Sequence, residues 1–307
     1  YITIGLFYEI LGPKMIWKIL GNESIGAIRF LDLFFILITK IILLTLALEI
    51  SKNVKFEYLL KNLFFVILSC VFLSLIDYAP DTDNIKYREI PILLTVLLFF
   101  KFLNNFDRYK KNYFLLFCLA VVVVFSYFWS IDRAITQNLL TLFIIFYLII
   151  NRKFIDTFVL VSTVIILWIL ISIFLGNEFD FFLNNTISIF KESTLLSGYI
   201  HPIPFSDETS SSRATKTILS ILFTILISLS LFLFSNNFLY KFKIYLLTIS
   251  LVSFLSYAYA LGRTDFTHLK QVFGFPLIFI CTFFLYLIFN VLESVKKKNF
   301  LNFKFLN

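Results

Sequence analysis

The feature that most constrains this chain is a series of apolar segments that hold few or no charged residues. Residues 157–175 read TFVLVSTVIILWILISIFL, and residues 113–129 and 217–235 likewise lack Asp, Glu, Lys and Arg. A helix needs roughly 20 mostly apolar residues to cross about 30 Å of hydrocarbon, or somewhat fewer where its ends absorb the mismatch. These segments therefore predict transmembrane helices.

The composition excludes a soluble domain. The chain is 60% hydrophobic and only 15% charged, and its mean hydropathy is +0.91. Soluble domains are roughly 45–50% apolar and about 25% charged. With only 8 glycines and 6 prolines, the chain also does not fit a disordered or collagen-like class. What remains is a polytopic membrane protein.

We predict an all-α transmembrane helical bundle of about nine spans, with an interfacial helix on its outer face. The predicted spans are 26–50, 62–76, 91–104, 113–129, 137–150, 157–175, 217–235, 244–260 and 272–291. Residues 1–25, broken by Gly12-Pro13, are expected to be an external interfacial or re-entrant segment. The bundle, 26–291, carries external loops at 77–90, 130–136, 176–216 and 261–271, and 292–307 form a basic cytoplasmic tail.

The charges in the connections predict the orientation. One alternate set of connections holds 14 Lys and Arg against 4 carboxylates, and the opposite set holds 10 against 13. Cytoplasmic loops carry the basic excess, so we expect the first set and the C-terminus inside. The net charge of +8 is thus a topology signal and does not point to nucleic acid. An odd number of spans ending inside also implies a start outside, so we expect an upstream helix before Tyr1.

The first candidate site lies in the external loop 77–90, which reads DYAPDTDNIKYREI. Asp77, Asp81 and Asp83 stand close together there. Clustered carboxylates bind hard divalent cations, so the pattern allows a metal contact as well as a solvated acidic loop. No other cofactor is indicated by the residues.

Two further external segments carry candidate substrate contacts. Asp132 and Arg133 follow an aromatic rim that ends at Trp129, and they could equally form a simple charge pair at a helix end. The largest loop contains Tyr199 and His201 in GYIHPIPF, where alternating prolines favour an extended segment. A loop of about 40 residues is long enough to suggest a function beyond connection.

The sharpest cluster lies in the last external link, GRTDFTHLK. Arg263, Asp265 and His268 fall within six residues, and a helix starting near Asp265 would point its first N–H groups toward an anion. A guanidinium offers a bidentate fork to phosphate. This pattern favours phosphate binding at the membrane surface, and Arg29, near the outer end of its span, could join the same site. A capped helix start with an Asp-Arg pair is the simpler alternative.

Several of these segments resemble the GT-C superfamily of integral-membrane glycosyltransferases. The segment GLFYEILGPKMIWKILGNESIGAIRF is similar to the one that follows the catalytic loop in that family, with Gly12, Pro13, Gly21 and Arg29 at the matching positions. WSIDRA, GYIHPIPF and ALGRTDFTHL resemble elements of its bacterial members. The resemblance spreads over most of the chain, although each motif is loose.

The resemblance implies an enzyme of the bacterial inner membrane that transfers a sugar from a polyprenyl-phosphate carrier on the external, periplasmic face. The acceptor would be a saccharide, a lipid or a protein. It also implies Arg263 and His268 as phosphate contacts with Arg29 in support, and a catalytic carboxylate in a first external loop upstream of Tyr1.

Two other functions fit the same features. One is an O-antigen-type polysaccharide polymerase or ligase, which uses similar donors but a different acceptor. The other is a flippase or transporter of lipid-linked sugars, which performs no chemistry and needs polar residues along a path through the bundle. The charge-free spans argue against an ion-coupled transporter.

Overall fold

The computed structural model describes residues 12–21, 25–76, 85, 87–105, 112–191, 204–207, 211–235, 238–261 and 266–304. All regular structure in these ranges is helical, which confirms the predicted all-α class. The helices are α1 (Gly12–Leu20), α2 (Ile25–Ser51), α3 (Tyr58–Ser74), η2 (Tyr87–Glu89), α4 (Ile90–Asn105), α5 (Tyr113–Trp129), α6 (Ile131–Ile150), α7 (Phe154–Leu175), α8 (Glu178–Lys191), α10 (Ser211–Phe234), α11 (Tyr240–Leu261), α12 (Phe266–Val272) and α13 (Gly274–Lys304).

Many of these helices have the length and composition of membrane spans. Five stretches are long and apolar enough to cross a bilayer: Arg29–Ser51, Arg133–Ile150, Phe154–Leu175, Ser211–Phe234 and Leu269–Lys296. The apolar helices α3 and α5 are shorter, with 17 residues each, which at 1.5 Å per residue is about 25 Å. The described chain thus has the helices of a multi-pass membrane protein. Each of the nine predicted ranges overlaps a helix, while the full count of nine spans stays a prediction.

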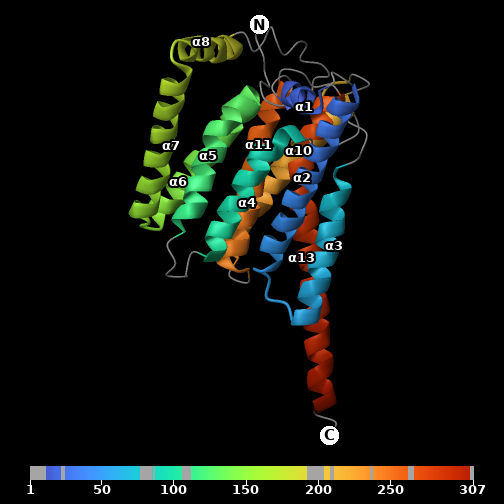
Figure 1. Ribbon diagram of the computed structural model, residues 1–307. Coiled ribbons are helices and arrows are strands. Elements are labelled where there is room, and N and C mark those ends of the chain that lie inside the picture. The colour runs from blue at the N-terminus through green and yellow to red at the C-terminus, as the bar shows by residue number, and fades with distance from the viewer. Residues whose placement is uncertain are drawn as a thin grey trace.

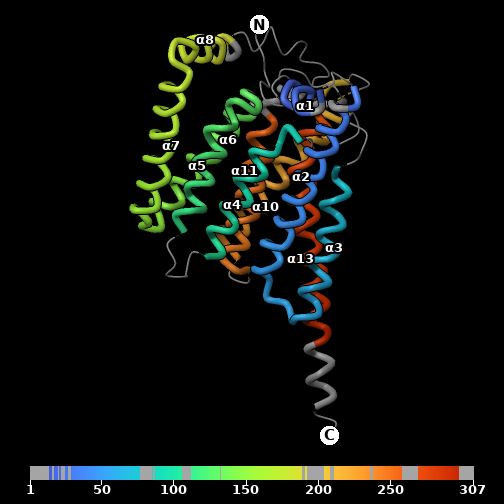
Figure 2. Tube along the Cα trace, viewed as in Figure 1, coloured from blue at the N-terminus to red at the C-terminus, as the bar shows by residue number. Residues whose placement is uncertain are grey.

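The long helices stand side by side and run alternately up and down, while α1 and α8 lie across one end (Figure 1). We call this end, with η2 and the start of α4, the upper end. The opposite end, with the links that follow α2 and α6, is the lower end, and α13 extends beyond it. Helices distant in sequence meet within the bundle, and Figure 2 shows α3 beside α13.

The core of the bundle contains a group of closely packed aromatic rings. Phe99 and Phe100 of α4 are fully buried, and Phe99 packs edge-on against Tyr147 of α6 with ring centroids 5.5 Å apart. Phe100 lies 4.2 Å from the ring of Tyr245 in α11, and Phe143 completes the group at 6.4 Å from Phe99. These five rings, which we call the aromatic layer, join three helices in the lower half of the bundle.

Helix α7 forms the edge of the bundle and shows the opposite pattern. Leu160 is the one buried residue of α7. Ile169, Ile173 and Phe174 are all more than half exposed. An apolar helix that exposes its side chains so fully in water would be costly, at about 25 cal/mol per Å² of apolar surface. This surface instead suits contact with lipid chains, where apolar side chains carry no such cost.

The start of α6 differs from the sequence prediction. The external link was expected at 130–136, but α6 already begins at Ile131, so that only Ser130 separates it from α5. Charged residues argue against an early start of an apolar span. In the fold, however, Arg133 lies buried in the first turn of α6, because a partner from another segment neutralises it.

Candidate functional site at the upper end of the bundle

Two segments that were predicted to be external, and that look unrelated in the sequence, meet at the upper end. Arg133 Nη2 of α6 lies 2.6 Å from Glu89 Oε1 of η2, and both side chains are only 2% exposed. The neighbouring Arg88 donates a hydrogen bond from Nε to Ser130 Oγ over 2.9 Å. The end of the loop 77–90 is therefore fastened to the junction between α5 and α6 by two polar contacts.

Ser130 makes this junction possible. Its backbone is extended, with φ −163° and ψ 114°, so it ends α5 and starts α6 in one residue. Its N–H donates to the Ser126 carbonyl over 2.9 Å, and its own carbonyl accepts from the Ala134 N–H over 3.0 Å. Arg133 consequently lies in the first turn of α6, where the helix dipole disfavours a cation. Glu89 compensates for that unfavourable position.

The short helix η2 directs three successive side chains toward three different elements. A 3₁₀-helix has three residues per turn, so consecutive side chains point about 120° apart. Glu89 reaches α6 and Arg88 reaches Ser130. Tyr87 turns to α2, where its hydroxyl forms a hydrogen bond with the Asp32 carboxyl. Pro91 follows in the first turn of α4, a position where its fixed φ favours a helix start.

An aromatic contact supports the same corner. Phe35, one turn after Asp32, lies 4.9 Å from Trp129 in an edge-on arrangement and 5.7 Å from Tyr87. Such aromatic pairs contribute about 0.5–1.5 kcal/mol beyond their buried area. Asp32 itself is half-buried, so its carboxyl stays accessible beside this packed corner. We call Asp32, Tyr87, Arg88, Glu89, Ser130 and Arg133 the upper cluster.

A polar column continues from the upper cluster into the bundle. Gln137, one turn below Arg133 and fully buried, donates from Nε2 to Thr95 Oγ1 of α4. No donor among the described residues reaches Gln137 Oε1. Thr141, one further turn down, donates from its hydroxyl to the backbone carbonyl of Gln137 over 2.8 Å. Beyond Thr95 and Thr141 the aromatic layer begins, so the column ends inside the bundle.

The candidates drawn from the sequence are distributed unevenly over the structure. Arg133 is part of the upper cluster, and Arg29 is exposed on α2, one turn before Asp32. His268 lies in α12 and Asp132 in α6, but their side chains lie outside the described part. The remaining candidates lie outside the described residues altogether: Asp77, Asp81, Asp83, Tyr199, His201, Arg263 and Asp265.

The metal contact predicted at Asp77, Asp81 and Asp83 stays untested for that reason. Within the described ranges, no group of three or more His, Cys, Asp or Glu side chains gathers closely enough to hold a metal ion. The phosphate site predicted around Arg263 and His268 likewise stays a prediction.

Sequence reasoning missed Glu89, Arg88 and Gln137. Glu89 and Arg88 stood among the charges of an acidic loop, and nothing near them in the chain reveals the partners Arg133 and Ser130, more than 40 residues away. A local signal did exist for Gln137, because Arg133, Gln137 and Thr141 recur every four residues and so share one face of a helix.

Comparison with family models, with curated proteins and with solved structures finds no match for the chain.

Proposed function

We propose that the chain is a membrane glycosyltransferase that moves a sugar from a polyprenyl-phosphate carrier to an acceptor at the upper end of the bundle. The supporting observation is the upper cluster, which gathers guanidinium and carboxylate groups from three separate segments. The motif resemblance to GT-C enzymes points to the same chemistry.

Transfer from such a donor needs two kinds of group. The bond between the sugar C1 and the phosphate oxygen breaks, and a bond from C1 to the acceptor oxygen forms. The leaving polyprenyl phosphate gains negative charge, which a guanidinium can stabilise. The acceptor hydroxyl loses a proton, which a carboxylate can take.

The upper cluster offers both kinds of group with different accessibility. Arg88 and Asp32 are half-buried, so substrate can reach them, and we assign Arg88 to the donor phosphate and Asp32 to the acceptor side. The buried pair of Glu89 and Arg133 holds η2 in place and acts as a positioning element. Arg263, His268 and Arg29 remain proposed phosphate contacts.

The aromatic layer favours this function over a flippase. A flippase needs polar groups along a path through the bundle, whereas Phe99 and Phe100 interrupt the polar column below Thr95. A polymerase or ligase uses a similar donor and shares the geometry, so the identity of the acceptor separates it from the main proposal.

The test is transfer by the full-length protein in proteoliposomes that contain polyprenyl-phosphate-linked sugars with a radiolabelled sugar. We expect release of polyprenyl phosphate together with a labelled product. Arg88→Ala should lower the rate about 10²–10³-fold, as is typical when one group that stabilises developing charge is removed. Arg263→Ala and His268→Ala should also abolish transfer.

Glu178→Gln is the matched control, because Glu178 is exposed on α8 at the same end and lies outside the upper cluster. It should transfer at the wild-type rate. Unchanged transfer in Arg88→Ala would show that the upper cluster is not part of the active site. If the donor moves across the bilayer without release of polyprenyl phosphate, the protein is a flippase and the proposed enzyme function is wrong.

A further inference from the structure

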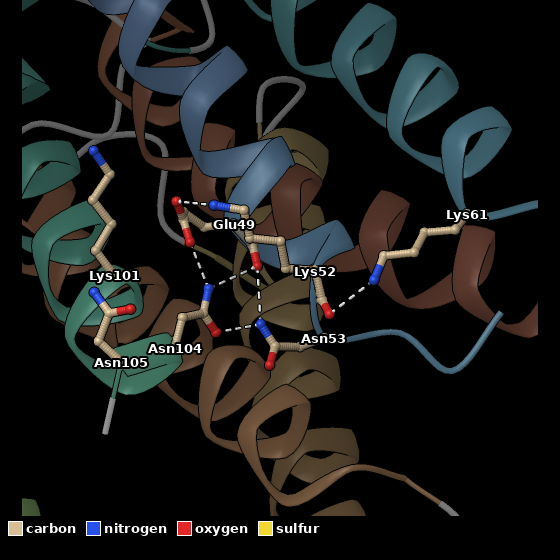
Figure 3. Close-up of a pocket in the computed structure, with 7 residues that line it drawn as sticks. All are labelled: Glu49, Lys52, Asn53, Lys61, Lys101, Asn104 and Asn105. Atoms are coloured by element: carbon tan, nitrogen blue, oxygen red, sulfur yellow. Dashed lines mark hydrogen bonds and ion pairs between the residues drawn. The ribbon is translucent and has the colours of Figure 1, made fainter. Parts of the chain in front are cut away.

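A polar cavity opens at the lower end, far along α2 and α4 from the upper cluster. Its volume is about 480 Å³, which is within the range of roughly 300–1,000 Å³ seen for small-ligand sites. Every residue that lines it is polar or charged: Glu49, Lys52, Asn53, Lys61, Lys101, Asn104 and Asn105 (Figure 3). Three ammonium groups thus share one cavity with a single carboxylate.

The carboxylate is already fully engaged by the protein. Glu49 is buried, and its Oε1 lies 2.8 Å from Lys52 Nζ while its Oε2 accepts from Asn104 Nδ2 over 2.5 Å. Asn104 in turn accepts hydrogen bonds from Asn53 and from the Tyr245 hydroxyl. This network ties α2, α4 and α11 together. Both oxygens of Glu49 thus already contact a protein side chain, and in the described part of the chain Lys61 and Lys101 have no acidic partner.

The remaining donors on the cavity wall make no hydrogen bond to another side chain within the described ranges. Lys61 Nζ donates to a single backbone carbonyl, that of Lys52, over 3.0 Å. Lys101 and Asn105 lie one turn apart on α4, and Figure 3 draws no interaction from either side chain to the other lining residues. Lysine is a flexible point charge that suits phosphate. Asn105 adds amide donors and an acceptor.

We propose that this cavity binds a phosphate-bearing anion. Once Lys52 is set against Glu49, neither Lys61 nor Lys101 has an acidic partner among the described residues, and an anion in the cavity would balance their charge. The lining residues are all polar or charged, which does not favour an apolar ligand. A basic pocket between helices at a membrane surface is a known setting for anionic headgroups.

Two sources could supply this chemistry, namely the headgroup of an anionic lipid or a soluble phosphate. The site lies at the end opposite the upper cluster and shares no residue with it. The proposal therefore does not depend on sugar transfer, and either one can fail while the other holds.

The experiment uses the full-length protein in lipid nanodiscs. In the first arm, nanodiscs contain phosphatidylcholine with or without phosphatidylglycerol, and native mass spectrometry counts the phosphatidylglycerol that stays bound. In the second arm, phosphatidylcholine nanodiscs are titrated with inorganic pyrophosphate in a calorimeter. Each lysine near an anionic surface contributes about fivefold in affinity, so the double variant Lys61→Gln, Lys101→Gln should bind about 30-fold more weakly.

Lys55→Gln is the matched control, because Lys55 is an exposed lysine of the same end that does not line the cavity. It should bind as the wild type does. Lys101→Arg keeps the charge and should also retain binding. Lysine-dependent binding in the first arm identifies a lipid, and lysine-dependent binding in the second arm alone identifies a soluble phosphate. Equal binding by the wild type and the double variant in both arms would overturn the proposal, as would equal losses in Lys55→Gln.

Discussion

Glu89 and Glu49 are buried carboxylates at opposite ends of one bundle, and the two ends neutralise them differently. Glu89 is paired with Arg133, a residue 44 positions away, and neither side chain is exposed by more than 2%. Glu49 is held by its helical neighbour Lys52, which is 50% exposed, and by the amide of Asn104. At the upper end, the carboxylate is paired with a guanidinium far away in the sequence, and the pair is buried from solvent. At the lower end, the carboxylate is paired with an ammonium three residues away, and both residues line a cavity.

The difference lies in what each contact has to hold. The upper pair joins η2 to α6 and so fixes a loop end on the bundle. The lower ion pair is local, because Lys52 follows Glu49 by three residues at the end of α2, and it joins no distant segment. Loss of one partner should therefore cost much more at the upper end than at the lower end.

The largest effect is expected from Arg133→Met, which leaves Glu89 buried without its cation. Removal of one partner of a buried ion pair costs about 3–5 kcal/mol. The free energy of unfolding should fall by that amount when the protein is unfolded by detergent in mixed micelles and followed by tryptophan fluorescence.

The double variant Arg133→Met, Glu89→Leu serves as its control. Replacement of a whole buried pair by apolar residues is often neutral or stabilising. The double variant should thus recover most of the loss. If it is less stable than Arg133→Met alone, the pair is not the reason for the destabilisation.

An intermediate effect is expected from Asn104→Ala at the lower end. This change removes the amide that contacts Glu49, Asn53 and Tyr245, and it leaves their buried polar atoms short of a partner. The free energy of unfolding should fall by about 1–3 kcal/mol. The adjacent Asn105→Ala should change it much less, because Asn105 stands outside the network, and equal losses would show that the network contributes nothing specific.

The smallest effect is expected from Lys52→Gln. Lys52 is half in water, and Asn104 still donates to Glu49 in its absence. Pairs of this kind contribute at most about 1 kcal/mol. The same unfolding measurement, repeated at high salt, should show an even smaller difference from wild type, because salt screens an exposed ammonium. A loss as large as that of Arg133→Met would contradict the contrast between the two ends.

The sequence predicted the helices well and the polar contacts poorly, for one physical reason. Apolar segments such as 157–175 determine a span by their own length and composition, and the helix there agrees with the prediction. The start of α6 was missed because Arg133 looks like a link residue until Glu89 is placed beside it. Local pattern carries no information about a partner that lies 44 residues away.

The lower network was missed for a related reason. Asn53 and Asn104 carry no charge, so they did not stand out near the ends of two apolar segments, and Glu49 was only a charge inside a span. They form one hydrogen-bond network together with Tyr245 of α11, whose hydroxyl contacts both Asn53 and Asn104. Only the packing of α2, α4 and α11 makes a site of these residues.

The aromatic layer has a consequence for electrical insulation. Between the upper cluster and the lower cavity, the buried rings of Phe99, Phe100 and Tyr147 pack against one another across α4 and α6. A membrane potential of 100 mV is worth about 2.3 kcal/mol per elementary charge. We therefore expect these rings to resist the passage of a charge along the polar column when the bundle stands in a membrane.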